Sequence, residues 1–571
     1  MYIDIVPNRT SRPAVLLREC YRENGKIVKR TIANLSDVPM HIVTVVRDML
    51  KGGIWVPYGK DVAIERSLPH GAVRALLAVL ARTGLLSAVA ARRSRERDIC
   101  VALIAERLLH GESKLASVRL WHSTTLADEL ALTGVKLAEV YAAMDWLGER
   151  QAAIERKLAR KHLADGSLVL YDLSSSYYEG SQCPLAQFGY SRDGKRGLPI
   201  IAYGVITDRE GCPVAVRVWE GNVADKTTVL EQVARVREEF GIERMTFVGD
   251  RGMLTETKIE ALRELPWMNW ISALRSEDVR TLLEAGAVQM SLNDQYGLAE
   301  VTSDDFPGER LIVCYNPLMA DERKRKRAAL MACTAAALNA IAAQAARRTR
   351  TPMSDAALGQ KAGRVINKWK MAKHVVTTMR SGRLTWSWNQ ERIAREEALD
   401  GLYVVRTNAP AQELPAADVV RGYKRLALVE RAFRSMKGMN NRVRPIYHRT
   451  PERVRAHIFL CMLAYYVEWH LRDALKEHLF DDEELREARD VRDAVAPARP
   501  SCGARAKKAR TAVEPHAVHS LSTLFEELNT LCRNTCRISV KGATIRYTVD
   551  TEPTAWQAAV LARVEGRERT Q

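Results

Sequence analysis

The spacing of apolar and polar residues divides the chain into stretches of different character. Residues 1–40 alternate apolar with polar positions, which is typical of a small β-hairpin. From about 70 to 165, apolar residues that are mostly Ala and Leu recur at helical spacing. We therefore predict a small N-terminal β module over residues 1–60 and a helical domain over residues 61–165.

The pattern changes again after residue 166. SLVLYDLSS, IIAYGVITD and PVAVRVWEG are predicted strands, and helices then alternate with the strands RMTFVGD and NWISAL. Three meandering strands followed by alternating helices and strands are typical of an α/β core of the ribonuclease H-like fold, a mixed sheet with flanking helices. A doubly wound nucleotide-binding fold is less favoured, because no glycine-rich loop follows the first strand. We place this core at residues 166–275 and 395–475.

The remaining segments differ from this core in composition. Residues 276–394 interrupt the strand pattern with Ala- and Arg-rich helical sequence, so we predict an insertion domain there. Residues 476–515 are rich in Ala, Arg, Asp and Pro with little periodicity, which indicates a solvated linker. Residues 516–571 are predicted to form a C-terminal module of a helix and a hairpin.

The charge of the chain is concentrated in two places. The chain has 571 residues and a formal net charge of +18. Residues 321–383 carry 15 basic and 3 acidic side chains, and residues 421–455 carry 11 and 2, so these two segments account for the whole excess. A local excess of basic side chains is typical of phosphate-binding segments, although solvated helices would show the same excess.

Cysteine usage and hydropathy suggest an intracellular protein. The ten cysteines are dispersed, with no CxxC pair and no matched histidine pair that would complete a zinc site. Cys532 and Cys536 are four residues apart, but structural thiols explain them better than metal ligands. We find no apolar run of about 18 residues and no signal peptide, so we expect a cytoplasmic, nucleoid-associated protein without a membrane anchor.

Two aspartates interrupt otherwise apolar strands. Asp172 in LVLYDLSSS shares a face with Leu168 and Leu170, and Asp250 ends the strand TFVGD. Burial of an unpaired carboxylate costs free energy, so these positions indicate either a metal site or caps of the following turns. Two divalent ions that act on a phosphate need several converging carboxylates, usually from strand ends.

A third carboxylate, Glu430, lies on a predicted amphipathic helix. At 100° per residue, Glu430 falls in a polar stripe about 60° wide with Tyr423, Arg434 and Lys437. The neighbouring apolar stripe contains Leu426, Val429, Phe433 and Met436. An ordinary salt bridge between Glu430 and Arg434, worth a few tenths of a kcal/mol, is the alternative interpretation.

Several segments between about 168 and 470 resemble the DDE transposases of bacterial insertion sequences, in the branch with a β-strand insertion before the Glu and a Tyr-Arg-Glu-Lys signature. The resembling segments are LVLYDLSSSYYEG, VWEGNVADKTT, TFVGDRGM, DGLYVVRTN, YKRLALVERAFRSMKG and RPIYHRTPERVRAHI. The resemblance implies that Asp172, Asp250 and Glu430 form a catalytic triad that holds two Mg²⁺ ions, for which Mn²⁺ can substitute.

The signature matches in part. Tyr423, Glu430 and Lys437 keep the spacing of the family, but Leu426 stands at the arginine position. Arg425 or Lys424 would have to make the phosphate contact of the missing arginine. Our candidate DNA-binding residues are Tyr423, Arg425, Arg434, Lys437, Arg444, His448, Trp386, Trp388, Arg323 and Lys324.

Some of these candidates have strong alternatives. Trp386 and Trp388 would stack on a flipped base by resemblance, but a half-buried strand pair is more common. The cluster 323–327 could contact DNA or end a solvated helix, and His448 could contact a phosphate or be structural. In the helical domain, Arg92, Arg93, Arg95 and Arg97 make this domain the expected reader of the DNA ends.

The resemblance implies a transposase that binds the terminal inverted repeats of its element and catalyses strand cleavage and transfer into target DNA. Because two ends must be paired before they are cut, a homodimer on double-stranded DNA is expected. Two alternatives remain: a non-catalytic DNA-binding protein derived from such an enzyme, and a cellular nuclease or resolvase on the same core.

Overall fold

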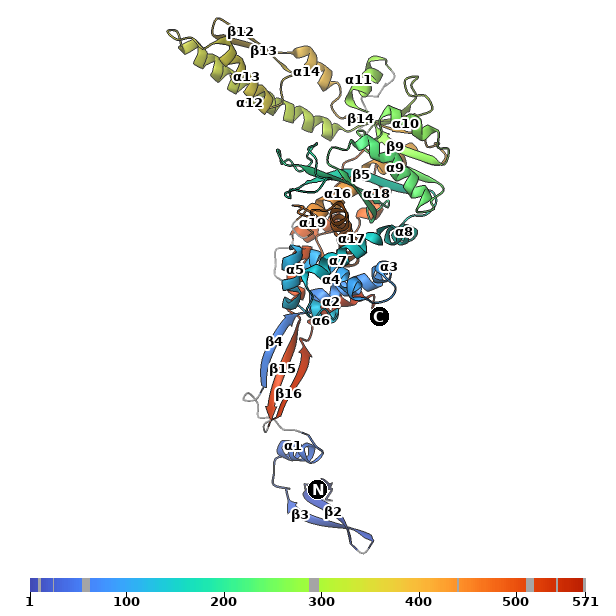
Figure 1. Ribbon diagram of the computed structural model, residues 1–571, viewed down its shortest axis with the longest axis vertical. Helices are drawn as coiled ribbons and strands as arrows, with labels where there is room; N and C mark the ends of the chain where they lie inside the picture. The colour runs from blue at the N-terminus through green and yellow to red at the C-terminus, as the bar shows by residue number, and fades with distance from the viewer. Residues whose placement is uncertain are drawn as a thin grey trace. The chain divides into compact units, whose positions relative to one another are not determined.

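The computed structural model describes residues 1–8, 12–23, 25–53, 62–286, 297–438, 441–509, 518–540 and 543–567. The chain forms two compact units, each of which uses residues from both ends of the chain. One unit contains Met1–Pro69 and Leu531–Glu552, and the other contains His70–Thr530 and Pro553–Gln571 (Figure 1).

The first unit is built mainly from two small antiparallel sheets. One has the order β1-β2-β3, with β1 (Tyr2–Val6), β2 (Ala14–Glu23) and β3 (Lys26–Asn34), and is followed by α1 (Met40–Leu50). The other has the order β16-β15-β4, with β4 (Val62–Pro69), β15 (Cys532–Val540) and β16 (Ala543–Asp550). Glu65 on β4 forms ion pairs with Arg537 and Arg546 of the other two strands.

The prediction of a separate C-terminal module over residues 516–571 is wrong. Its hairpin pairs with β4, because two strands alone form only a marginally stable sheet. Its helices α20 (Leu521–Leu528) and α21 (Ala555–Glu565) pack against the first helix of the helical domain instead. The C-terminal segment therefore contributes to both units.

The helical domain forms the first part of the second unit. Its helices are α2 (Gly71–Arg82), α3 (Leu85–Val89), α4 (Arg95–Leu109), α5 (Lys114–Leu120), α6 (Leu126–Glu129), α7 (Leu137–Glu149) and α8 (Gln151–His162). A 3₁₀ turn, η1 (Trp121–Ser123), follows α5. The long, almost fully buried α17 (Pro451–Leu475) packs against α4 and α7.

An eight-stranded mixed sheet forms the centre of the second unit, with the order β10-β11-β14-β9-β8-β5-β6-β7. Its strands are β5 (Ser167–Tyr177), β6 (Ile200–Thr207), β7 (Pro213–Glu220), β8 (Met245–Val248), β9 (Met268–Ala273), β10 (Gly297–Val301), β11 (Arg310–Tyr315) and β14 (Leu402–Thr407). β5, β6 and β7 are antiparallel neighbours, whereas β8 runs parallel to β5 and β9 runs parallel to β8. This mixed sheet is consistent with the predicted ribonuclease H-like core.

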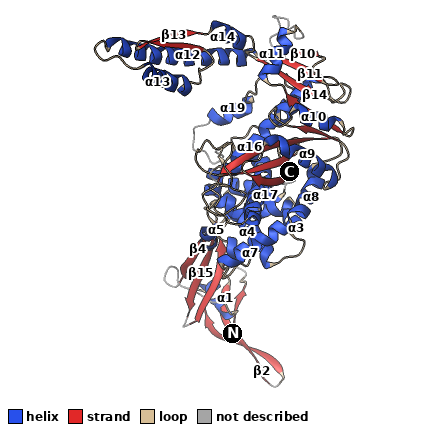
Figure 2. Ribbon diagram, turned by 45° about the horizontal axis from the view of Figure 1, so that its top comes forward, coloured by secondary structure: helices blue, strands red, loops and turns tan. Residues whose placement is uncertain are grey.

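Helices cover both faces of the sheet (Figure 2). They are α9 (Asp225–Glu238), α10 (Glu256–Arg263), α11 (Ser276–Glu284), α15 (Ala416–Lys424), α16 (Leu426–Lys437) and α17. The Tyr171 hydroxyl donates a hydrogen bond to Thr228 Oγ1 of α9 at 2.9 Å. Because successive strand residues point to opposite faces, Asp172 points away from α9, toward the face on which α16 packs.

The predicted insertion domain, residues 276–394, is only partly separate. β10 and β11 extend the central sheet through pairing with β14, because their buried apolar residues continue its core. The remainder is α12 (Pro317–Arg347), α13 (Asp355–Lys368), β12 (Val375–Arg380), β13 (Arg383–Trp388) and α14 (Gln390–Glu397). Both figures show α13 and the β12–β13 hairpin alongside α12, around a small core of Leu338, Ala362, Ile366 and Leu384.

One described helix, α12, is long and apolar enough to cross a membrane by length and composition alone, with an 18-residue window of mean hydropathy 1.5. The expectation that no apolar run reaches this length was therefore wrong, because many alanines in sequence raise the mean hydropathy. Helices of soluble proteins pass the same test, and α12 packs against α13 and β13.

The predicted solvated linker over residues 476–515 is ordered where it is described. It contains η2 (Lys476–His478), α18 (Leu485–Val491) and α19 (Cys502–Ala509), and its end lies outside the described residues. Lys424 Nζ donates to the carbonyl of Val495 at 2.9 Å, and Arg421 donates to the carbonyl of Arg492. These hydrogen bonds fix the segment to α15. Composition and periodicity do not reveal such an attachment.

A buried ion pair joins the helical domain to the sheet. The Glu155 side chain of α8 is fully buried, forms a hydrogen-bonded ion pair with Arg235 of α9, and accepts the backbone N–H of Val216 on β7 at 2.9 Å. Without Glu155, the buried Arg235 would keep only its ion pair with the partly exposed Glu239 at 3.0 Å. Removal of one partner from a buried ion pair typically costs about 3–5 kcal/mol.

We therefore predict that Glu155→Ala lowers the melting temperature of the full-length protein by several degrees in a thermal denaturation assay. Glu149→Ala is the matched control, because the Glu149 side chain is 76% exposed and pairs only with its neighbour Arg150. The control should shift stability by no more than about 0.5 kcal/mol. Equal melting temperatures for both variants would contradict the role of the Glu155 pair.

Candidate active site

The first two carboxylates lie side by side because of strand register. β5 and β8 are parallel neighbours, and Leu170 pairs with Val248. Asp172 follows Leu170 by two residues and lies at the middle of β5, and Asp250 follows Val248 by two residues and lies just beyond β8, so the two aspartates occupy equivalent positions along the parallel pair. Neighbouring strands lie about 4.8 Å apart, which brings the two side chains to one edge of the sheet.

The third carboxylate comes from α16, which packs on β5 and β6 through its apolar face. The buried residues of this face are Leu428, Val429, Ala432, Phe433 and Met436. The Phe433 ring packs edge-on against Tyr203 of β6 at 5.8 Å between ring centres. Glu430 lies on the exposed side of α16. No ion pair joins Glu430 to Arg434 in the described part of the chain, so the salt-bridge interpretation is wrong.

The electrostatics of Asp172 indicate that the three carboxylates are close together. Burial and, to a smaller extent, the negative charges of Asp250 and Glu430 raise the pKa of Asp172 to about 7, against the opposite effects of the hydrogen bond from Leu173 N–H and the charge of Arg192. Asp172 Oδ1 accepts that N–H at 2.8 Å, and Asp250 Oδ1 accepts the N–H of Arg251 at 2.7 Å. The site therefore carries negative charge that its own residues do not neutralise.

Tyr423 reaches the site from a different helix than the sequence predicts. Residues 416–437 form two helices, α15 and α16, which separate at Arg425, so Tyr423 does not share a helical stripe with Glu430. The Tyr423 hydroxyl instead donates a hydrogen bond to Asp250, and burial together with the charge of Asp250 raises the pKa of Tyr423. Tyr423 thus orients the second carboxylate.

Lys437 lies on α16 near β5, but its ammonium is engaged within the protein. Lys437 Nζ donates to the carbonyl of Ser175 at 2.6 Å and to Asp193 at 2.9 Å. Burial lowers the pKa of Lys437 against the opposite effect of Asp193. Arg444 forms an ion pair with the same carboxylate at 2.6 Å.

Asp193 is a residue that the sequence analysis missed. Its side chain is only 2% exposed, and it holds Lys437, Arg444 and the backbone N–H of Tyr177. It lies in the connection of residues 178–199 between two antiparallel neighbours, β5 and β6. This connection is much longer than a hairpin loop, and its length is the signal that could have drawn attention to it.

Arg425 does not contact the candidate site, which corrects the prediction that it replaces the signature arginine. Its side chain is 7% exposed and forms ion pairs with Glu210 at 2.8 Å and Asp490 at 2.6 Å. It also donates to the carbonyl of Arg209. Lys424, the other replacement considered, is bound to backbone carbonyls of residues 495 and 496. Both residues stabilise the corner between α15 and α16.

His448 lines a basic pocket of about 590 Å³. Burial and the positive charges of Lys114, Arg107 and Arg453 lower the pKa of His448 to about 3, so the imidazole is neutral and packs against His457. The Lys114 ammonium is buried and has no hydrogen-bond partner among the described residues. The basic residues that line this pocket are Arg107, Lys114, Arg442, Arg444, Arg449 and Arg453.

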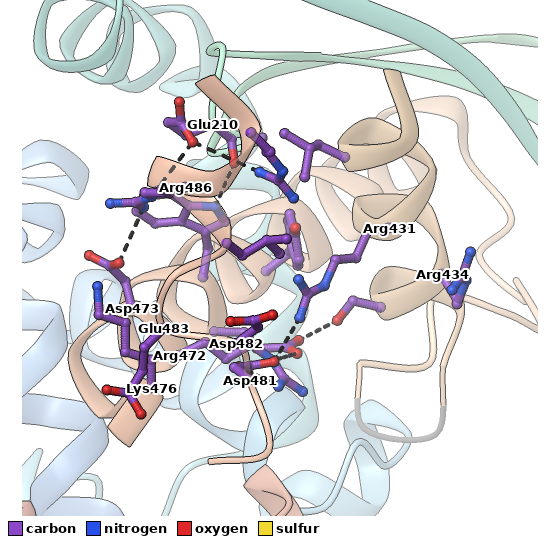
Figure 3. A pocket seen from close by; sticks show the side chains of 18 of the residues that line it. Glu210, Arg431, Arg434, Arg472, Asp473, Lys476, Asp481, Asp482, Glu483 and Arg486 are labelled. Carbon is purple, nitrogen blue, oxygen red and sulfur yellow. Dashed lines mark hydrogen bonds and ion pairs between the residues drawn. The ribbon is translucent and has the colours of Figure 1, made fainter. Parts of the chain in front are cut away.

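A second pocket, of about 400 Å³, lies on another side of α16 (Figure 3). Its charged side chains pair with one another: Arg431 with Asp481, Arg472 with Glu468, and Arg486 with Asp473. Arg434 is exposed at its margin and has no ion-pair partner in the described ranges. Because the opposite charges around this pocket largely compensate one another, we interpret its side chains as an ion-pair network that stabilises the fold and not as a reaction site.

The remaining candidates lie outside the carboxylate cluster. The rings of Trp386 and Trp388 pack edge to face at 5.2 Å, and Trp386 Nε1 donates to Asn339, as expected for a half-buried strand pair. Arg323 donates to the carbonyl of Leu399, whereas Lys324 is exposed.

The arginine cluster of the helical domain makes contacts within that domain. Arg93 and Arg97 form ion pairs with Asp98, and Arg95 forms one with Glu139. Arg92 is exposed.

Among solved structures, a similar chain is found in the cryo-EM structure of a piggyBac transposase synaptic complex with hairpin DNA. The TM-score is 0.32 at 9% sequence identity, over 80% of this chain and 82% of that chain. A search of curated proteins finds no match. A family model described as "Transposase DDE domain" matches residues 166–467, more than half of the chain and all three carboxylates. The chain therefore belongs to the DDE transposase domain family.

Proposed function

We propose that the protein is a DNA transposase that cleaves the ends of its element at the Asp172, Asp250 and Glu430 site and joins them to target DNA. The observation that carries this proposal is the convergence of two in-register aspartates and one helical glutamate at one edge of a mixed sheet with ribonuclease H-like strand order. Family membership supports a transposase.

The donor set fits divalent magnesium or manganese. Hard cations prefer carboxylate oxygens, and burial together with the nearby charges of Asp250 and Glu430 raises the pKa of Asp172, so a bound cation would stabilise the ionised carboxylate. Asp172, Asp250 and Glu430 are the residues that would hold two such ions. When bound, the ions would supply Lewis-acid activation of the attacking oxygen and stabilisation of the leaving oxygen.

The residues of the chain position the DNA and the carboxylates. Tyr423 orients Asp250 through its hydrogen bond, and the Asp193 carboxylate fixes Lys437 and Arg444 beside β5. Several arginines line the pocket around His448, and Arg449, which has no ion-pair partner among the described residues, would be free to contact a DNA phosphate. Contacts of this kind position the DNA backbone but carry no sequence information.

The proposed partners are the two terminal inverted repeats and the target DNA, bound by a homodimer that pairs the ends. A non-catalytic DNA-binding descendant is less favoured, because it would not need the three converging carboxylates. A cellular nuclease or resolvase would cut without preference for one pair of repeats. Paired inverted repeats in the DNA that flanks the coding sequence would favour the transposase.

Asp172→Ala should abolish cleavage of DNA that carries the flanking inverted repeats. Loss of several kcal/mol of transition-state stabilisation corresponds to a rate lower by on the order of a thousandfold or more. DNA binding, measured by fluorescence anisotropy, should persist. Asp165→Asn is the control, because Asp165 is an exposed carboxylate beyond the opposite end of β5. Unchanged cleavage by Asp172→Ala would overturn the catalytic assignment.

The effect of Asp172→Asn on stability should depend on pH. At pH 5 the wild-type carboxyl is protonated, since its pKa is about 7, and it resembles Asn in charge. At pH 8 it is ionised and repelled by two carboxylates, so wild-type stability falls as pH rises from about 4 to about 7. In metal-free protein the variant should therefore melt higher than wild type at pH 8, and this difference should become smaller at pH 5.

Magnesium should reverse this difference. At pH 8, Mg²⁺ should raise the melting temperature of wild type and leave that of Asp172→Asn nearly unchanged, because the cation neutralises the ionised carboxylates. Melting curves with EDTA and with Mg²⁺ provide the measurement. A melting-temperature difference that is independent of both pH and Mg²⁺ would argue against a charged metal site.

DNA affinity should depend on the arginines that have no ion-pair partner among the described residues. Arg434→Ala and Arg449→Ala should each weaken DNA binding and reduce the salt slope by about one, because each would remove one phosphate contact. Arg425→Ala should lower the melting temperature and leave the salt slope unchanged, since Arg425 is buried in ion pairs. Anisotropy titrations at several salt concentrations distinguish these outcomes. Equal slopes for all three variants would contradict this assignment.

A further inference from the structure

A second cluster of potential metal ligands lies away from the three carboxylates. It joins His162 at the end of α8, Cys212 at the turn before β7, and His470 on α17. Their ligand atoms all lie within 4.8 Å of one another. Cys212 Sγ lies 3.9 Å from His162 Nε2 and 4.0 Å from His470 Nε2.

We propose that His162, Cys212 and His470 bind one zinc ion that ties the helical domain, the central sheet and α17 together. Zinc bonds measure about 2.3 Å to sulfur and about 2.0 Å to nitrogen, so a tetrahedral site separates a sulfur from a nitrogen ligand by about 3.6 Å. The two sulfur–nitrogen separations need to contract by only a few tenths of an ångström. Nitrogen and sulfur donors favour zinc over magnesium.

The surroundings of His162 resemble those of a metal-binding imidazole. Asp208 Oδ2 lies 3.6 Å from His162 Nδ1, on the side of the ring opposite to the cluster. A carboxylate at this position holds the proton on Nδ1 and leaves the lone pair of Nε2 free to bind a metal. His162 Nε2 lies 3.0 Å from the Tyr466 hydroxyl. Zinc would replace this contact, and a water molecule would occupy the fourth position around the ion.

The Asp208 turn also fixes the cysteine. Asp208 Oδ1 accepts the backbone N–H of Cys212 at 2.8 Å and that of Glu210 at 2.9 Å. Since Asp208 Oδ2 lies beside His162, one carboxylate contacts two of the proposed ligands. Cys212 is completely buried, and three separate elements enclose it. A preformed arrangement of this kind lowers the entropic cost of metal binding.

The bond-forming step balances in protons. On binding, the Cys212 thiol releases one proton to solvent as one S–Zn bond forms, and each imidazole binds the ion through the lone pair of an unprotonated ring nitrogen.

Strand register separates this cluster from the carboxylate site. Thr207, which precedes the Asp208 turn, pairs with Leu170, toward the amino end of β5 from Asp172. The cluster lies where α8 and α17 meet the edge strand β7. The zinc ion would therefore lie outside the carboxylate site, and its loss would lower stability without removing a carboxylate ligand.

Metal analysis of the full-length protein tests the proposal. After EDTA treatment, incubation with Zn²⁺ and dialysis, wild type should retain about one zinc per chain. Cys212→Ser and His470→Asn should retain none above buffer background. Cys100→Ser is the matched control, because Cys100 is an equally buried thiol in the helical domain, and it should retain zinc like wild type.

Cobalt provides a readout that does not depend on variant folding. Wild type loaded with Co²⁺ should show a thiolate-to-cobalt charge-transfer band and strong tetrahedral visible bands, and Zn²⁺ should displace them. Zinc should also raise the melting temperature of wild type and of Cys100→Ser, but not that of His470→Asn. Absence of the cobalt bands in wild type, or zinc retention by both ligand variants, would overturn the proposal.

Discussion

The structure depends on one constraint: it must hold three negatively charged carboxylates close together at one edge of a sheet. In-register pairing of β5 and β8 fixes Asp172 beside Asp250, and α16 adds Glu430. The repulsion and the burial are visible in the raised pKa of Asp172. A protein keeps such an arrangement only if cations balance it, which is why we interpret the cluster as a metal site for phosphoryl transfer.

The surrounding structure keeps these carboxylates in place through buried ion pairs. Asp193 joins α16 to β5 through Lys437, and Arg425 stabilises the corner that separates α15 from α16. Glu155 and Arg235 join the helical domain to the sheet. Each of these pairs is internal, so the basic residues within it support the site rather than bind DNA. The net charge of a segment is therefore a poor guide to its DNA contacts.

The two proposed metal sites differ in donor chemistry. Carboxylate oxygens at Asp172, Asp250 and Glu430 suit hard cations that bind and exchange during catalysis. The neutral imidazoles and the thiol of Cys212 suit zinc, which holds a fixed tetrahedral geometry. Donor type and position would thus direct the two proposed metals to separate sites of one chain.

The sequence by itself determined the strands of the core, the three carboxylates and the amphipathic helix of Glu430, because alternation and helical period are local properties of the chain. It could not show that residues 531–552 pair with β4, that residues 476–509 pack on α15, or that Asp193 holds Lys437. It also gave no motif for His162, Cys212 and His470, which lie 50 and 258 residues apart along the chain. Only the tertiary structure decided these points, since each depends on contacts between segments whose spacing carries no local signal.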